Sequence, residues 1–256
     1  MDNKTFLNIS ESECLIVYKE ILKNSDMLWE SGKILANSGN YGQGISSSII
    51  SIEELIKTII VLFDAKGFEL RKIKGISSFF RSHEIRYVVA YSMFAICLFG
   101  EDLLKALKRM KKEPAWMLKL NEERKNDKDF FEKRLRFYVL RKFITLRREL
   151  NWFSKVYLFR QEGFYCDYKS TLKTPIQISE TDFTEVIKRL EKVKSVGKGL
   201  IQALESDDEE YLKRFSDFII DFKKNQYADK IANALAVIRK TRKPPFELLK
   251  EMFDDI

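Results

Sequence analysis

Glycine and proline are scarce in this chain, and that scarcity limits the folds open to it more than any other feature. The 256 residues include 10 Gly and 4 Pro, whereas Leu, Ile, Lys and Glu are abundant. A chain with few helix breakers and many helix formers favours long helices. The composition therefore predicts an all-α fold.

Apolar residues recur at helical spacing in several long segments. The first two predicted helices, 11–37 and 41–65, are joined by a polar, glycine-rich turn at residues 37–44. The second helix carries small side chains that would let another helix come close, namely Ser46, Ser47, Ser48 and Ser51. A long apolar helix is expected next, from about Ser77 to Lys111.

The second half of the chain also shows helical patterns. A charged linker at residues 111–129 precedes a strongly basic predicted helix at 130–157, and residues 163–179 are expected to form an extended loop. Ser179, with Asp182 three residues on, predicts the N-cap of a helix that continues to about residue 196. Another helix is predicted at 207–240, and a short amphipathic piece at 246–253. We expect residues 1–200 to form one helical domain, with its basic linker and helix at about 105–157, and residues 201–256 to form a C-terminal helical extension packed on it.

Cysteine usage and hydropathy indicate in which cellular compartment the protein is expected. Cys14, Cys97 and Cys166 are odd in number and far apart, which suggests a reducing cytoplasm rather than a disulfide framework. The polar, acidic first residues do not resemble a signal peptide. The longest apolar run, 87–99, is shorter than the ~20 residues that a membrane span needs. We therefore expect a cytoplasmic protein that does not contact a membrane.

The net charge of +8 is unevenly distributed. Residues 105–148 contain 16 Lys or Arg against 6 Asp or Glu, whereas the rest of the chain contains 30 against 32. Such a basic stretch would attract a phosphate backbone. The alternative is a solvated helix face, which is the commonest meaning of a run of charges.

The chain has a single histidine, His83, and this excludes much familiar chemistry. There is no HExxH, no His/Cys cluster, no GxSxG, no phosphate-binding loop and no dinucleotide fingerprint. No cofactor and no metal site are predicted. If the protein is an enzyme, His83 is the leading general acid or base, because the unperturbed pKa of imidazole lies near neutrality.

Two interpretations of His83 remain open. On a helix it shares a face with Arg86, and an imidazole beside a guanidinium can move a proton and stabilise a phosphorane, as RNA cleavage through the 2′-hydroxyl requires. Alternatively, His83 is a residue of the first helical turn that bonds a carboxylate such as Glu53 or Glu54. Glu53 and Lys57 lie four residues apart in the predicted second helix and are expected to pair on one face.

Two blocks of the sequence resemble one family. The first is SDMLWESGKILANSGNYGQGISSSIISIEELIKTIIVL followed by FFRSHEIR, and the second is FRQEGFYCDYKSTLKTPIQISETDF. Together, over about residues 12–200, they resemble the abortive-infection AbiV family of bacterial phage-defence proteins, which is grouped with the HEPN helical domains. The matching positions are Gly39, Tyr41, Glu53, Glu54, Lys57, Phe80, His83 and Arg86, then Tyr165 to Tyr168 and Pro175.

This resemblance implies an antiparallel helical bundle, commonly a homodimer, that arrests growth or translation during phage infection. It also implies candidate site residues, namely Glu53, Glu54, Lys57, His83 and Arg86. Many HEPN relatives are metal-independent endoribonucleases with an Arg-x4–6-His motif. Here the arginine position of that motif falls on Ile76, Ser77 or Ser78, so the resemblance leaves open whether this protein is an enzyme.

The sequence therefore predicts an anti-phage protein that cleaves or binds RNA or blocks the translation machinery, with a phage protein as its activator or target. In this reading His83 transfers protons, Arg86 and Lys57 hold phosphate, and Glu53 or Glu54 orients them. One alternative is a non-enzymatic helical toxin or sensor that binds a phage or host protein. Another is a plain helical scaffold.

Overall fold

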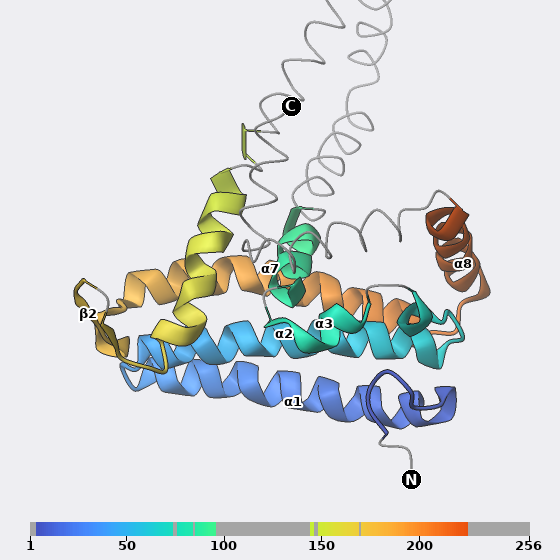
Figure 1. The fold of residues 1–256 in the computed structure, drawn as a ribbon, viewed down its shortest axis with the longest axis horizontal. Helices are drawn as coiled ribbons and strands as arrows, with labels where there is room; N and C mark the ends of the chain where they lie inside the picture. Colours follow the sequence, from blue (N-terminus) through green and yellow to red (C-terminus); the bar gives the residue numbers. More distant parts are fainter. Residues whose placement is uncertain are drawn as a thin grey trace, which may run out of the picture.

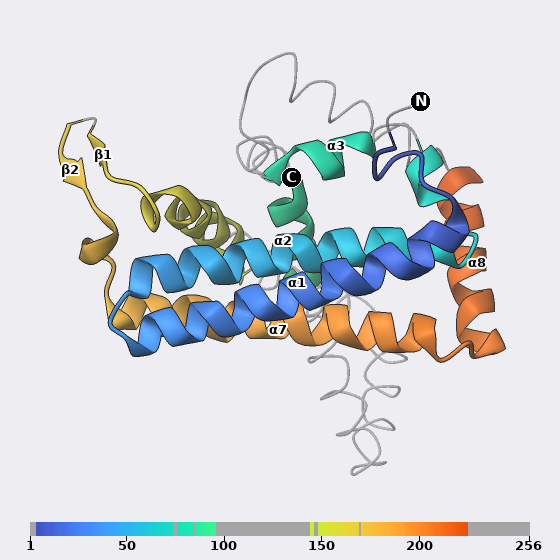
Figure 2. The ribbon, with the colours of Figure 1, turned by 90° about the horizontal axis from the view of Figure 1, so that it is seen from below.

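The fold was analysed in a computed structural model, which describes residues 4–73, 76–83, 85–95, 144–145, 148–168 and 170–224. Three long helices lie side by side: α1 (Glu11–Asn37), α2 (Tyr41–Ala65) and α7 (Glu180–Glu205). The central one is α2, which packs against both others, and α1 runs antiparallel to α2 and α7 (Figures 1 and 2). The described part of the chain is thus mostly helical, as its composition predicts.

Local sequence signals fix the ends of these helices. The Ser10 hydroxyl accepts a hydrogen bond from the Glu13 backbone N–H, and the Glu13 side chain accepts one from the Ser10 N–H. Ser179 and Asp182 form the same reciprocal cap at the start of α7, as predicted. Gly39 turns the chain between α1 and α2 with φ of 79°, a conformation that glycine adopts without strain. The predicted bounds of the first two helices are confirmed, whereas α7 continues beyond residue 196 to Glu205.

Serines bring α1 and α2 close together, as their small size predicts. Ser25 Oγ donates to the Ser51 carbonyl at 2.8 Å, and Ser51 Oγ donates to the Ser25 carbonyl at 2.6 Å. Both side chains are buried. The exchange satisfies polar groups that would otherwise be desolvated without a partner.

Most of the α2 surface is buried, because helices cover it on several sides. Its buried apolar side chains are Ile45, Ile49, Ile52, Leu55, Ile56, Ile59, Ile60, Val61, Leu62 and Phe63. Residues 85–95 and 148–162 form two further helices whose aromatic side chains join this core. Tyr87 and Phe94 lie against Phe153, with ring centroids 5.6 and 5.2 Å apart. These two helices bring additional polar side chains to the face of α2 that they cover.

The predicted helix starting at Ser77 is not continuous. The short helix α3 (Ser77–Arg81) ends before Ser82, which is not helical, and the chain is helical again at residues 85–95. The Ser82 hydroxyl accepts a hydrogen bond from the Ile85 N–H at 3.3 Å, in the manner of an N-cap. The prediction missed this break because the apolar period continues through it. The predicted continuation from residue 96 to Lys111 lies outside the described residues.

Other elements are short or only partly described. The basic helix is described over 148–162 and so extends past residue 157, but most of the basic stretch and the linker at 111–129 lie outside the described residues. The predicted loop contains a hairpin of β1 (Asp167–Tyr168) and β2 (Leu172–Lys173), then the 3₁₀ turn η2 (Pro175–Gln177). A further 3₁₀ turn, η1 (Leu70–Lys72), follows α2, and α8 (Glu209–Lys224) packs Phe215 against Phe63 of α2. The predictions for 225–240 and 246–253 also fall outside the described residues.

In the described part of the chain, no helix is both long enough and apolar enough to cross a membrane.

Gly163 holds the end of helix 148–162 against α2. A Cβ on Gly163 would overlap the Gly42 carbonyl oxygen and the Ser46 hydroxyl. Close by, Ser46 Oγ donates to the Phe159 carbonyl at 2.7 Å. This approach fixes where the last turn of helix 148–162 lies along α2.

We expect Gly163→Ala to destabilise the protein by about 1–3 kcal/mol, because the methyl group must displace α2 backbone atoms. The measurement is the free energy of unfolding in urea. Gly199→Ala is the control: a Cβ there meets no atom within 4 Å and alanine is the better helix former, so stability should hold or rise. Equal stability of the two variants would contradict the close contact.

Candidate functional site

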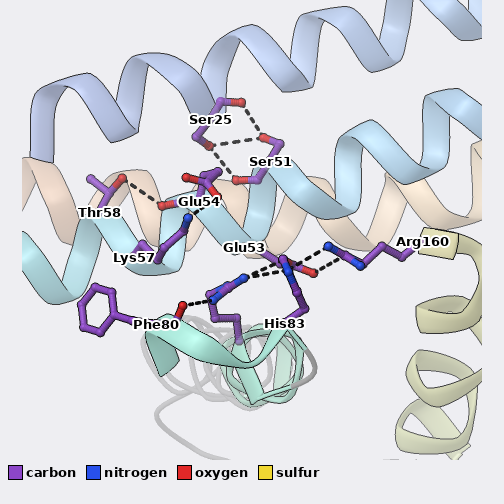
Figure 3. Close-up of polar contacts among 10 residues, drawn as sticks. Ser25, Ser51, Glu53, Glu54, Lys57, Thr58, Phe80, His83 and Arg160 are labelled. Carbon is purple, nitrogen blue, oxygen red and sulfur yellow. Dashed lines mark hydrogen bonds and ion pairs between the residues drawn. The ribbon is translucent and has the colours of Figure 1, made fainter. Parts of the chain in front are cut away.

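A buried carboxylate, that of Glu53, lies at the centre of a polar cluster. Glu53 comes from the middle of α2, and its side chain is 0% exposed. Its Oε2 lies 2.5 Å from His83 Nδ1 and 3.2 Å from Arg86 Nη2, and its Oε1 lies 3.0 Å from Arg160 Nε. Figure 3 shows Glu53, His83 and Arg160 converging from three segments of the chain. The cluster therefore joins α2 to residues 83–86 and to helix 148–162.

The imidazole of His83 is held at one nitrogen. Besides Glu53, its Nδ1 lies 2.7 Å from Arg86 Nη2 and 2.8 Å from Arg160 Nη2. Guanidinium N–H groups only donate and an ionised carboxylate only accepts. Glu53 therefore favours a proton on Nδ1, whereas the two arginines favour a lone pair there. Any movement of either arginine would change how Nδ1 is hydrogen-bonded.

The other face of His83 is open. Its side chain is 49% exposed, and its contacts within the described part of the chain all involve Nδ1. Nε2 is thus the nitrogen available to solvent or to a substrate. A histidine oriented by a carboxylate at Nδ1 and open at Nε2 is a common arrangement for general acid–base chemistry.

The two arginines differ in accessibility. The Arg86 side chain is 3% exposed, and its Nη1 also donates to the Phe80 carbonyl at 3.2 Å. The Arg160 side chain, from the last turn of helix 148–162, is 17% exposed. With one carboxylate and two guanidinium groups, the cluster is positive even when the imidazole is neutral. An anion such as a phosphate would be attracted to the exposed side, where Arg160 and His83 lie.

Tyr87 is a buried and uncharged side chain near this cluster. It is completely buried, and it packs on Tyr157 with ring centroids 5.3 Å apart. Burial, and then the nearby negative charge of Glu53, raise the pKa of Tyr87 well above its ordinary value of 10. The phenol therefore stays un-ionised at any physiological pH, and it adds no charge to the cluster.

Glu54 and Lys57 form a separate pair. Lys57 Nζ makes an ion pair with Glu54 Oε1 (Figure 3), and Lys57 also lies 5.9 Å from the ring centroid of Phe6. The predicted pairing of Glu53 with Lys57 is wrong, because Glu53 instead faces the helices that supply His83 and Arg160. Of the five candidate residues, the structure brings together Glu53, His83 and Arg86. The interpretation of His83 as a partner of a carboxylate agrees with the geometry, and that carboxylate is Glu53.

Arg160 was missed by the sequence reasoning. It lies 77 residues after His83, so no local spacing connects them. One feature of the sequence could have indicated Arg160. It lies near the start of FRQEGFYCDYKS, and this block resembles the same family as the block that contains His83. Arg86 and Arg160 provide guanidinium groups beside His83, although Ile76, Ser77 and Ser78 occupy the positions of the missing motif arginine.

No group of three or more His, Cys, Asp or Glu side chains comes together within the described residues to hold a metal ion. Glu53, the carboxylate of this cluster, is engaged by the two arginines and by His83, and its single negative charge offsets only part of their positive charge.

A helical bundle is the fold that a HEPN-type domain implies. The model of one such family, AbiV, matches residues 13–195, which is well over half of the chain. The chain therefore belongs to the AbiV family, and membership implies a part in abortive infection, a form of phage defence. No curated protein and no solved structure matches this chain.

We expect Glu53→Gln to destabilise the protein by about 3–5 kcal/mol, because it leaves two largely buried guanidinium groups without their counter-charge. Urea unfolding measures the change. The adjacent Glu54→Gln is the control: that carboxylate is also largely buried but pairs with a single lysine, so its loss leaves one cation without a counter-charge and should cost less than Glu53→Gln. A Glu53→Gln protein as stable as Glu54→Gln would show that the cluster does not hold the helices together.

Proposed function

We propose that this AbiV protein arrests the growth of phage-infected cells by cleaving RNA without a metal ion, and that Glu53, His83, Arg86 and Arg160 form the site. One observation carries the proposal: a half-exposed imidazole is held at Nδ1 by a buried carboxylate and two guanidinium groups. An open Nε2 beside positive charge is suited to proton transfer at a phosphodiester.

In the proposed reaction, His83 Nε2 accepts the proton of a ribose 2′-hydroxyl as that oxygen attacks the adjacent phosphorus. The bond from phosphorus to the 5′ oxygen breaks, and the leaving oxygen takes a proton from water or from the imidazolium. The products are a 2′,3′-cyclic phosphate and a 5′-hydroxyl end. The pentavalent phosphorane carries additional negative charge, which a guanidinium stabilises.

The burial of the two arginines separates their roles. Arg160 is the more exposed, so it is the better candidate to touch the phosphate, whereas Arg86 is buried and holds His83 and Glu53 in place. Lys57 was expected to hold phosphate, but its ion pair with Glu54 engages it elsewhere, and our proposal gives it no direct part.

A specific observation favours a second candidate, a non-enzymatic module that binds a phage or host protein. The loop after helix 148–162 exposes large apolar side chains, namely Phe164, Tyr165, Tyr168, Leu172 and Ile176. Exposed apolar clusters of this kind often mark protein-binding surfaces. A phage protein that activates or inhibits the enzyme would also fit such a surface.

We also propose that the protein is a homodimer. Ile16, Met27 and Ile34 are exposed on α1. Their spacings of 11 and 7 residues place them along one line of the helix surface. An apolar line on the outer helix of a bundle is suited to pairing with a second copy of itself.

The central prediction concerns cells that express the wild type, His83→Ala or Arg160→Ala. Both variants should lose at least about 100-fold of RNA cleavage, because proton transfer or phosphate stabilisation is removed. Growth, the integrity of total RNA and amino-acid incorporation should be followed together, with and without phage. Purified proteins compared by circular dichroism show whether each variant is folded.

Arg189→Ala is a matched control for Arg160→Ala. Arg189 is also a partly buried, ion-paired arginine, with a side chain 23% exposed, but it pairs with Glu149 and Glu185 away from the site. It should retain cleavage. If translation stops while RNA stays intact in the wild type and in His83→Ala alike, the enzyme proposal is wrong and the binding module is favoured.

A further prediction concerns the basic stretch, 105–148, which we propose supplies RNA affinity. If the attraction is electrostatic, affinity should fall at least tenfold between about 50 and 200 mM salt, because binding releases counterions from the phosphates. Fluorescence anisotropy of a labelled single-stranded RNA measures it with His83→Ala, which should bind without cleaving. An affinity independent of salt would remove this stretch from the proposal.

A further inference from the structure

The segment before α1, residues 4–10, folds back over the end of α2, and we call it the strap. The guanidinium of Arg71, in η1, fastens it: Nη1 donates to the Phe6 carbonyl at 2.7 Å and Nη2 donates to the Ile9 carbonyl at 3.0 Å. The Nε of Arg71 makes an ion pair with Asp64 of α2, and both side chains of this pair are buried. A buried, charge-assisted clamp therefore fixes the backbone of the strap.

The strap places one aromatic ring against α3. The rings of Phe6 and Phe80 are stacked, with centroids 5.6 Å apart and an interplanar angle of 16°. The view in Figure 2 shows the strap, in dark blue, reaching the end of α3. Offset stacks of this kind contribute stability beyond simple burial.

The position of α3 depends on such packing. It has five residues, Ser77–Arg81, and a helix this short has no stability of its own. Ser82 is not helical, so α3 is not continuous with the helix that follows. Contacts such as Phe6 with Phe80 must therefore keep α3 in place.

The Phe80 backbone connects α3 to the site. Its carbonyl accepts a hydrogen bond from Arg86 Nη1, and Nη2 of the same guanidinium contacts both Glu53 and His83. A shift of Phe80 would therefore turn the Arg86 guanidinium. Moving this guanidinium therefore changes the hydrogen bonding at Nδ1 and the position of the His83 ring.

We propose that the strap positions the His83 site through the stack of Phe6 on Phe80 and the hydrogen bond from Arg86 to Phe80. Phe6 and Arg71 are positioning residues, and release of the strap loosens the site. The catalytic consequence of this proposal rests on the proposed function, but the structural part does not. A partner that displaces the strap would change the activity without touching the catalytic residues.

The single histidine makes the test direct, because an NMR spectrum of the full chain contains one imidazole signal, from His83. The variants are Phe6→Ala, Phe6→Tyr, which keeps the ring, and Val196→Ala. Val196 is the control, since it is an apolar residue 36% exposed against 39% for Phe6 but lies on α7. We expect the His83 ring signal to shift or broaden in Phe6→Ala and to stay at its wild-type position in the other two.

RNA cleavage by the same proteins gives the second measurement. Phe6→Ala should lower kcat on the order of tenfold with little change in KM, because the site is misaligned while the surface that binds RNA is intact. Phe6→Tyr should restore kcat. A general loss of stability would not give this pattern, and circular dichroism of each variant checks that it is folded.

The two proposals can fail separately. A His83 signal unchanged in Phe6→Ala overturns the role of the strap, whatever the activity. If the His83 signal moves only in Phe6→Ala and the wild-type protein does not cleave RNA, the role of the strap is supported and the proposed cleavage is overturned.

Discussion

The arrangement of this protein depends on one desolvated charge, the carboxylate of Glu53. A carboxylate with no exposure to water is tolerated only when it is paired and hydrogen-bonded. Its partners here come from residues 83–86 and from residue 160, far apart in the sequence, and the pairing requires both segments to pack on the middle of α2. The same contacts that satisfy the charge also orient the only histidine. Stability and the candidate chemistry therefore share their atoms, and a change that disturbs one disturbs the other.

Local signals predicted much of the fold, because they act within a few residues. The apolar period, the polar turn at Gly39 and the cap at Ser179 located α1, α2 and the start of α7. The break at Ser82 was not predicted. A serine within an apolar period does not show by itself whether its hydroxyl caps a helix or lies on the surface of a continuing one, and only the packing of α3 decides between them.

The site was predicted only in part, because local spacing does not reveal tertiary partners. The resemblance supplied Glu53, His83 and Arg86, and the structure brings these three together. Helical spacing suggested that Glu53 pairs with Lys57, but spacing describes which pairs are available on an isolated helix, and tertiary partners compete for the same carboxylate. Arg160 could not be found by spacing at all. Its contact with His83 spans 77 residues and exists only because Gly163 lets helix 148–162 approach α2 closely.

The contact between Arg160 and His83 bears on the missing arginine of the HEPN motif. A guanidinium stabilises a phosphorane by its position and its charge, and the number of residues between it and the histidine has no chemical effect. Residues 76–78 contain no arginine, but Arg160 places a guanidinium beside His83 from a different helix, and we propose that it takes this part. A site assembled in this way also has a different sensitivity: its geometry depends on how helix 148–162 packs on α2 and on the hydrogen bond between Arg86 and the Phe80 carbonyl of α3, and not on one rigid helical turn. On the proposal above, a partner that shifts either element would change the geometry of the site.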